Sequence, residues 1–333
     1  MVGRLAAARA ARALSSAERL GTTEFFGALP PRFPCALHRQ GSMRGGSERL
    51  GAVVDVGDVR ELDEEGAGLV LDALRAHGII VIKGQQLTRA EQVRFTGMLG
   101  ETIILPPSFE GRDPEPNQPA IQRVTNFWAD GSWKGPAGVF GTYWHQDGQF
   151  WQAPLHNIMS MLYSAALPPS GGQTGFADLR AARATLSTSL LEEAARCSIR
   201  ASVRNIADFA KGTEEDLALF PDVSHPMLST HLLDGGALLY LGSHAMEVEG
   251  MESAEDGRVL LTRLLAHTTE TPEFTYFHTW ELGDLLIWDN TQVLHHGFPY
   301  ENNGINRREM YRSQARMRSA SPGRSGGCIY GAR

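Results

Sequence analysis

The sequence of 333 residues predicts a mainly β protein with flanking helices, an α+β architecture in which short strands form a closed or sandwich-like β structure. Three observations support this prediction. Many short stretches rich in β-branched and aromatic residues are separated by Gly, Pro and Asn turns. A few longer segments have the apolar spacing and the caps of helices. The content of 42% hydrophobic and 21% charged residues is that of an ordinary globular protein.

The expected domain opens with a strand, a helix, a second strand and a second helix. These elements are expected at residues 50–56, 63–77, 78–83 and 88–99. Gly78 and Gly100 are expected to end the two helices, and Thr88 with Glu91 forms a capping box at the start of the second helix. We expect these four elements to be structural and assign them no catalytic role.

The second half of the chain is expected to carry most of the strands. Residues 101–140 are rich in proline and glycine, and the loop 109–118 in them is either a lid over a site or a plain connection. Strands are expected at residues 156–163, at two positions within 225–241 around the turn 234–236, and at 274–280, 285–288 and 307–317. Residues 178–220 are expected to be a helical insertion, and 252–267 an amphipathic helix capped by Ser253.

Charge, cysteine content and hydropathy limit the classes of partner. The net charge of -7 argues against binding to nucleic acid. The three cysteines, Cys35, Cys197 and Cys328, are far apart and form neither a disulfide framework nor a zinc pattern, which indicates a reducing compartment. No apolar run approaches the roughly 20 residues that a membrane helix needs. A small-molecule partner is therefore expected, with no role for nucleic acid or membrane, and a homo-oligomer is left open.

The first 48 residues differ in composition from the rest of the chain. Residues 1–50 contain eight arginines and three acidic residues, and Arg4, Arg9, Arg12 and Arg19 lie among alanines and leucines. This pattern is compatible with a transit peptide, and equally with a disordered or helical extension. We expect a tail at 1–48, one domain at 49–318 and a tail at 319–333. A cytoplasmic location is expected, or a mitochondrion or plastid if the tail is a transit peptide.

Chemistry is first indicated by His145 and Asp147, which are two residues apart. On an extended strand their side chains would point to the same face. With a third ligand from elsewhere they would form a two-histidine, one-carboxylate set, which suits non-haem Fe(II) because it leaves positions open. Neighbouring aromatic residues, including Tyr143 and Trp144, could shield such a site from water. The alternative is a structural histidine beside a surface aspartate.

The last expected strand places two arginines on one face. Arg308, Met310 and Arg312 alternate with residues that face the other way. An arginine inside a β structure is costly unless an anion meets it, and its guanidinium can bind a carboxylate through two hydrogen bonds. Arg308 is thus a candidate anchor for a dicarboxylate, and Arg312 for an acidic group of the substrate. Surface salt bridges are the alternative for both.

Taken together, these motifs make the chain similar to a known family over about residues 50–318. It resembles the Fe(II)/2-oxoglutarate-dependent dioxygenases of the taurine dioxygenase and 2,4-dichlorophenoxyacetate dioxygenase family. The matching stretches are Gly78–Gln85, Trp144–Asp147, Gly171–Thr174, His225-Pro226, Thr230-His231, Phe274–Trp280, Gly283–Leu285, Trp288–Asn290, His295-His296 and Arg307–Arg312.

The resemblance implies a double-stranded β-helix, or jelly roll, with helices packed against it. It implies that His145, Asp147 and His295 hold the iron, whereas His296 would face the other way. Thr174 and Arg308 would bind the far carboxylate of 2-oxoglutarate. Arg312 matches the position that grips the sulfonate in taurine-type members, and we add Tyr143 as a candidate substrate contact.

Two details bear on the substrate and the reaction. Leu105 stands where taurine-type members have a histidine that helps to hold the sulfonate, which points to a more apolar substrate. Asp147 is present, whereas halogenating relatives have a small residue there, so hydroxylation with Fe(II), 2-oxoglutarate and O2 and release of succinate and CO2 is expected.

Three alternatives remain. A carnitine-pathway-type hydroxylase shares this catalytic domain but carries an N-terminal zinc module, for which only Cys35 and His38 are present. A cupin-type metal protein would not need 2-oxoglutarate. A non-catalytic β-barrel could have kept the fold.

Overall fold

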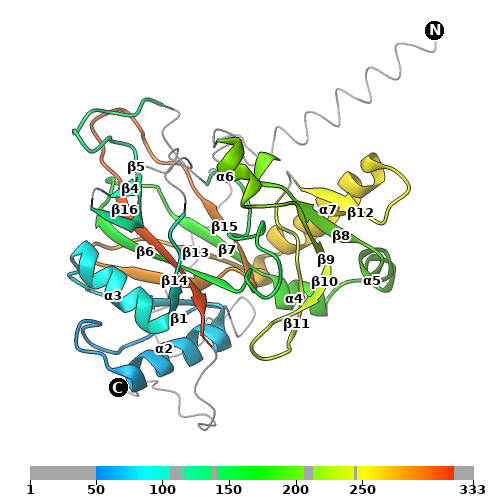
Figure 1. Cartoon of the computed structure of the whole chain (residues 1–333), viewed down its shortest axis with the longest axis horizontal. Coiled ribbons are helices and arrows are strands. Elements are labelled where there is room, and N and C mark those ends of the chain that lie inside the picture. The colour runs from blue at the N-terminus through cyan, green and yellow to red at the C-terminus, as the bar shows by residue number, and fades with distance from the viewer. Residues whose placement is uncertain are drawn as a thin grey trace. The chain divides into compact units, whose positions relative to one another are not determined.

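The structure, a computed structural model, describes residues 50–105, 114–115, 117–136, 141–205, 213–243 and 246–318. The tails expected at 1–48 and 319–333, and most of the loop 109–118, lie outside the described residues, and the domain boundaries stay predictions. Within the described residues the chain consists mainly of β-sheets with helices against them, as expected (Figure 1).

The largest sheet has eight strands and forms one wall of the site. Its order is β1 (Ala52–Val53), β2 (Ile79–Ile82), β14 (Leu285–Asp289), β6 (Ile158–Ala166), β16 (Glu309–Met317), β5 (Gln118–Thr125) and β4 (Pro114–Glu115), and β3 (Gly100–Thr102) also pairs with β16. All of these pairs are antiparallel except that of β1 with β2. The longest strands, β6 and β16, lie side by side near the middle of the sheet.

A second, three-stranded antiparallel sheet faces the first. Its order is β13 (Thr275–His278), β7 (Thr174–Asp178) and β15 (Val293–Gly297). One hydrophobic cluster joins the two sheets, because it contains Phe176 of β7 and Val293 of β15 together with Ile79, Leu286 and Trp288 of the large sheet. The space between the sheets is therefore a packed core at this end.

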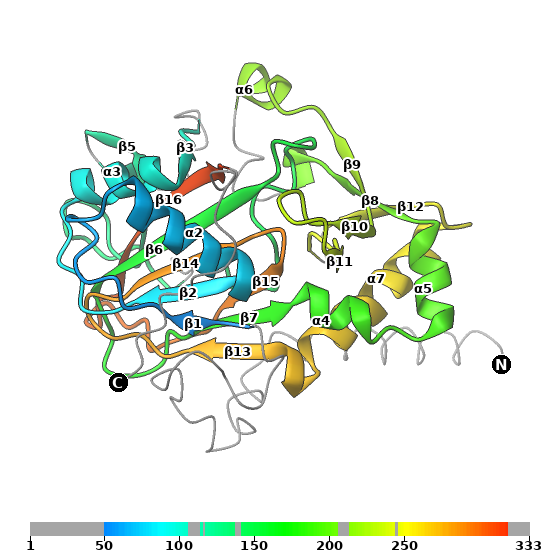
Figure 2. The same cartoon turned by 90° about the horizontal axis from the view of Figure 1, so that it is seen from below.

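The outer face of the large sheet is covered by the helices α2 (Glu64–His77) and α3 (Arg89–Leu99), as Figure 2 shows. A second hydrophobic cluster fills this contact. Strand β2 shows the two-residue period clearly, since Ile80 and Ile82 belong to the helix-facing cluster and Ile79 and Val81 to the inner one.

The caps expected at Gly78, at Thr88 with Glu91 and at Ser253 are confirmed, and Asp63, expected as the first residue of a helix, is itself an N-cap. The Asp63 side chain accepts a hydrogen bond from the Gly66 amide at the start of α2, and Gly78 ends this helix with a left-handed φ of 68°. The capping box of Thr88 and Glu91 is complete in α3. Ser253 caps α7 (Ala254–Thr269).

One expected element is partly wrong. Residues 178–220 were expected to be a helical insertion, and they do contain α4 (Leu179–Ala184), α5 (Thr188–Ala195), the 3-10 helix η4 (Val203–Asn205) and α6 (Glu214–Ala218). They also contain β8 (Ser198–Ala201), in which Ile199 and Ala201 are buried while Ser198 and Arg200 are not. This two-residue alternation lies between helices and is too short to dominate a local prediction.

Strand β8 pairs with β9 (Val223–Pro226) and β12 (Glu247–Glu249). The hairpin expected around 234–236 is present as β10 (Leu228–Thr230) and β11 (Ala237–Leu239). A further 3-10 helix, η5 (Pro272–Phe274), precedes β13. Helices α4, α5 and α7 pack with these strands around a third hydrophobic cluster.

No helix in the described ranges is both long and apolar enough to span a membrane. The expectations about compartment, nucleic acid and oligomeric state stay predictions.

Candidate metal centre

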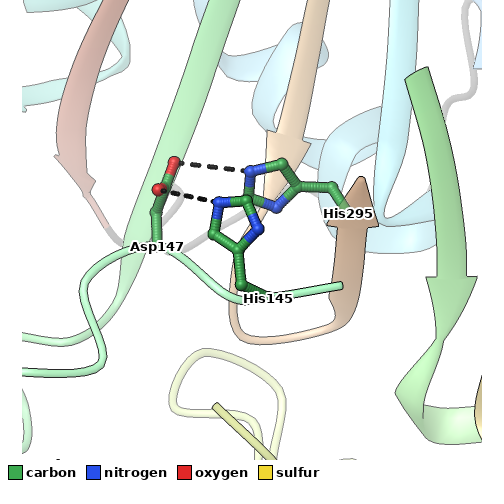
Figure 3. A group of neighbouring side chains, drawn as sticks. All are labelled: His145, Asp147 and His295. Atoms are coloured by element: carbon green, nitrogen blue, oxygen red, sulfur yellow. Dashed lines mark ion pairs between the residues drawn. The ribbon is translucent and has the colours of Figure 1, made fainter. Parts of the chain in front are cut away.

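The three expected metal ligands come together from two parts of the chain, as Figure 3 shows. His295 lies in the middle of β15, and His145 pairs with it through backbone hydrogen bonds of 3.0 and 2.8 Å. Asp147 does not continue as a strand, so the expected extended geometry at 145–147 is wrong in part. The chain turns at Gly148, where φ is 75°, and the Asp147 amide donates to Oδ1 of Asn290 at 3.1 Å.

The ligand atoms surround one small space. Nε2 of His145 lies 3.9 Å from Oδ1 of Asp147, and Nε2 of His295 lies 3.8 Å from its Oδ2. These distances are too long for hydrogen bonds. All three ligand atoms lie within 4.8 Å of one another, an arrangement that could hold one metal ion. His296 points elsewhere and contacts the rings of Trp144 and Phe298, as expected.

The orientation of His145 suits a metal ligand. Its Nδ1 lies 2.8 Å from the Tyr143 carbonyl oxygen, which can only accept a hydrogen bond. Nδ1 therefore carries the proton, and the lone pair of Nε2 faces Asp147.

The surroundings also keep the ligands in their metal-binding protonation states. Burial by itself would raise the pKa of the Asp147 carboxyl, but Arg312, the two imidazoles and Ser160 hold it well below its usual value. Burial, and then the neighbouring His145, lower the pKa of His295 well below its usual value. An ionised carboxylate and a neutral imidazole are the forms that bind divalent metals.

Arg308 is a buried cation without an anion. It is 8% exposed, and its Nη2 has only a long contact of 3.4 Å to the Gly172 carbonyl oxygen. Its Nε has no hydrogen-bond partner, and within the described residues no carboxylate pairs with its guanidinium. Burial lowers the pKa of Arg308 to about 10, and the nearby Tyr300 offsets this effect only in part.

Thr174, at the start of β7, is also buried. Its Oγ1 accepts a hydrogen bond of 3.1 Å from Nε1 of Trp280, so its own hydroxyl proton can be donated to another acceptor.

A cavity of about 120 Å³ connects these groups. All seven predicted site residues line it: Tyr143, His145, Asp147, Thr174, His295, Arg308 and Arg312. Its other walls are partly apolar and include Phe150, Leu162 and Trp288. Leu105 packs against the aromatic cluster of Phe150 and Phe220.

Sequence reasoning missed three polar residues around Asp147. Oδ2 of Asp147 accepts hydrogen bonds from Ser160 at 2.7 Å and from Gln314 at 3.1 Å, and Asn290 binds its backbone amide. Ser160 lies two residues before the inward-facing Leu162, and Gln314 two residues after Arg312. The strand period therefore carried a signal that both side chains face the site.

Fold and site thus define a mainly β protein with a candidate mononuclear centre of two histidines and one carboxylate. Comparison with known proteins places it more closely. The family model described as "Taurine catabolism dioxygenase TauD, TfdA family" matches residues 42–314.

The chain is 34% identical over 249 residues to the alpha-ketoglutarate-dependent 2,4-dichlorophenoxyacetate dioxygenase of Burkholderia sp. (strain RASC), covering 71% of this chain and 80% of the relative. It is 28% identical over 271 residues to the (S)-phenoxypropionate/alpha-ketoglutarate-dioxygenase of Sphingobium herbicidovorans, covering 76% and 87%. The crystal structure of AAD-2 in complex with Mn(II) and N-oxalylglycine is similar with a TM-score of 0.68 and 28% identity, covering 82% of this chain and 97% of that one. This chain belongs to the TauD/TfdA family of dioxygenases, and the expected family and enzyme class are confirmed.

Proposed function

We propose that this dioxygenase holds Fe(II) with His145, Asp147 and His295, and the far carboxylate of 2-oxoglutarate with Arg308 and Thr174. We also propose that its two facing sheets form a double-stranded β-helix. The use of 2-oxoglutarate and O2 agrees with the names of the relatives, which are alpha-ketoglutarate-dependent dioxygenases, and Fe(II) suits the set of two histidines and one carboxylate. Oxidation of the substrate, by hydroxylation, accompanies release of succinate and CO2.

The unpaired guanidinium of Arg308 carries this proposal. A buried charge without a partner is strongly destabilising, and a carboxylate that binds to it removes much of this penalty. The two-pronged guanidinium suits a carboxylate, and the Thr174 hydroxyl lining the same cavity can donate a third hydrogen bond. A cupin-type protein that does not use 2-oxoglutarate has no need of this pair.

Bound Fe(II) would supply the redox chemistry with O2 and the keto acid. The protein's own residues orient and enclose the reactants. Arg308 and Thr174 fix one end of 2-oxoglutarate, so that its other end reaches toward the three ligands. Apolar walls such as Phe150 and Leu162 exclude water from the cavity.

We propose a small organic acid with an apolar body as substrate. Arg312 lies 3.2 Å from Asp147, so an acidic group held by Arg312 would lie beside the metal ligands. Tyr143, whose ring centroid is 4.8 Å from that of His145, would contact the body of the substrate. Leu105 and the aromatic cluster behind Phe150 favour an apolar body over a taurine-like one. The two curated relatives are named for aryloxy acids, which fit this description.

The test is anaerobic titration of purified protein with Fe(II) and 2-oxoglutarate, followed by the visible charge-transfer band of the chelated keto acid. We expect a band with the unaltered protein. In Arg308→Ala, the apparent Kd for 2-oxoglutarate should rise about 30-fold or more, because removing one partner of a buried charge pair costs about 2–5 kcal/mol.

Arg307→Ala is the matched control. Arg307 is the adjacent arginine, its side chain is 45% exposed, and it pairs with Glu309 outside the cavity. The band should be unchanged in this variant. No band in the folded, unaltered protein would contradict the proposed co-substrate, and equal titrations for both variants would contradict the role of Arg308.

A further inference from the structure

We propose that Ser160 and Gln314 are positioning residues that bind one oxygen of Asp147 and so leave only the other oxygen to the metal. This inference rests on the proposed metal site and adds a coordination mode to it. It is carried by a hydrogen-bond network whose donor directions can be assigned step by step.

The first step assigns the Asn290 amide. Its Oδ1 lies 2.8 Å from Nε1 of Trp288 and 3.1 Å from the Asp147 backbone nitrogen, both of which can only donate. Its Nδ2 lies 3.1 Å from the Ile158 carbonyl oxygen, which can only accept. The Asn290 side chain therefore has a single consistent orientation.

The second step assigns the Ser160 hydroxyl. Its oxygen accepts hydrogen bonds of 2.9 Å from Nδ2 of Asn290 and 2.9 Å from Nε2 of Gln314. Both lone pairs are then used, so its single proton must go to Oδ2 of Asp147, at 2.7 Å.

The third step assigns Gln314. Its Oε1 is 3.4 Å from Nη2 of Arg312, which can only donate, so its Nε2 faces Asp147. Nε2 donates to Oδ2 of Asp147 at 3.1 Å as well as to Ser160.

The two oxygens of Asp147 thus differ. Oδ2 accepts from Ser160, Gln314 and Arg312, whereas Oδ1 accepts only from Arg312, at 3.3 Å. Oδ2 has two lone pairs, so these three donors leave neither of them to a metal. A free lone pair remains on Oδ1, which lies 3.9 Å from Nε2 of His145, whereas the fully hydrogen-bonded Oδ2 is the oxygen 3.8 Å from Nε2 of His295.

One-oxygen binding matters for the reaction class. Two histidines and one carboxylate oxygen leave about three positions of a six-coordinate ion open, and a carboxylate bound through both oxygens would take one of them. Outer hydrogen bonds of this kind are known to orient metal ligands.

The sheet itself holds the network in place. In the large sheet, Ser160 of β6 is directly opposite Trp288 of β14 on one side and Gln314 of β16 on the other. Each of these side chains is therefore placed by strand register, and strands position a site more rigidly than loops do.

The test compares Ser160→Ala, Gln314→Met and the double variant, using Mn(II) as the probe without 2-oxoglutarate. Mn(II) affinity is measured by calorimetry, and the number of bound waters by pulsed EPR in oxygen-17 water. We expect about three bound waters in the unaltered protein and fewer in the double variant, with about a 10–100-fold loss of affinity.

Two matched controls contact the same strands, one from β6 itself and one from α3. Ser164 of β6 is buried and donates to the Glu281 carbonyl oxygen, and Gln92 donates to the Tyr311 carbonyl oxygen on the other face of β16. Ser164→Ala and Gln92→Met remove a buried hydroxyl and a buried amide without touching Asp147, so they should keep both Mn(II) affinity and water count.

The outcomes separate this inference from the proposed function. Failure of the unaltered protein to bind Mn(II) overturns the metal site itself. If the unaltered protein binds Mn(II) and the double variant has the same number of bound waters, the metal site stands. In that case the proposal that Ser160 and Gln314 leave only one oxygen of Asp147 to the metal is wrong, whether or not the affinity for Mn(II) falls.

Discussion

Among the described residues, the buried arginines Arg123, Arg180 and Arg308 have different surroundings. Arg123 forms an ion pair with Glu309 at 3.1 Å, and Arg180 one with Asp234 at 2.8 Å. Of these three, only Arg308 lines the cavity, and no carboxylate of the described residues pairs with its guanidinium. At the scale of residues, the proposed function therefore follows from the carboxylate that Arg308 lacks. A buried charge without a counter-charge is unfavourable, and a bound ligand with a carboxylate would supply that counter-charge.

A second residue-scale feature is His156, which is 7% exposed and lies beside the rings of His225 and Tyr240. Burial, and then the neighbouring His225, lower the pKa of His156 to about 4 from 6.5. Between these pH values the unfolded chain binds one proton more than the folded chain at this site. Stability should therefore fall as the pH falls through this window, by about 3 kcal/mol for this group.

We predict that His156→Phe, which keeps a ring in this place, makes the free energy of unfolding less dependent on pH between about 6.5 and 4. Urea unfolding at several pH values measures this. The slope should decrease by about 1.4 kcal/mol per pH unit. An unchanged slope would show that His156 does not titrate in this way.

At the scale of elements, strand alternation decides what faces the site. In β16 the inner face presents Met310, Arg312 and Gln314, and the outer face contributes Ala315 and Met317 to the core under the helices. A shift of register by one residue would exchange these two sets. The site therefore depends on the pairing of β16 with its neighbours.

Gly100, which begins β3, approaches β16 very closely. A Cβ at this position would lie 2.0 Å from the Arg316 carbonyl oxygen, which is backbone and cannot move aside alone. We predict that Gly100→Ala lowers the free energy of unfolding by about 1–3 kcal/mol, as overpacking typically does. Urea unfolding measures this loss.

Gly68→Ala is the control for this prediction. Gly68 lies within α2, and a Cβ there meets nothing within 4 Å. Alanine should stabilise the helix by about 0.5–1 kcal/mol. If Gly100→Ala and Gly68→Ala had the same free energy of unfolding, the close approach of β3 to β16 at Gly100 would not destabilise the Gly100→Ala variant.

At the scale of the whole molecule, the metal ligands come from two distant parts of the chain. His145 and Asp147 precede β6, whereas His295 lies in β15 of the smaller sheet. The ligand set exists only after both sheets have formed, so a metal should bind the folded state and stabilise it.

We predict that Mn(II) at 100 times its Kd raises the free energy of unfolding by about 2.7 kcal/mol. Thermal unfolding with and without Mn(II) measures this as an increase in Tm. Asp147→Ala should lose the increase. An equal increase in this variant would mean that Mn(II) acts elsewhere on the protein.

Much of the fold was predictable because its signals are local. The two opening helices were predicted, together with the end of the first at Gly78 and the capping box of Thr88 and Glu91, because these signals act within one helical turn. Strand β8 was missed because four residues are too few for their alternation to stand out between two helices. The strand-like path expected at Asp147 was wrong because Gly148 and the distant Asn290 turn the chain there.

By itself, the sequence determined the mainly β class, the limits of the two opening helices and, through its similarity to a family, the candidate ligands and anion-binding residues. Only the tertiary structure showed that Arg308 lacks a carboxylate partner and that Ser160 and Gln314 bind one oxygen of Asp147. The physical reason is distance along the chain. Caps and strand alternation act over a few residues, whereas Gln314 lies 167 residues from Asp147 in the sequence. Ser160 is only 13 residues from Asp147, but it meets Gln314 and Asn290 through the pairing of strands that are far apart in the sequence.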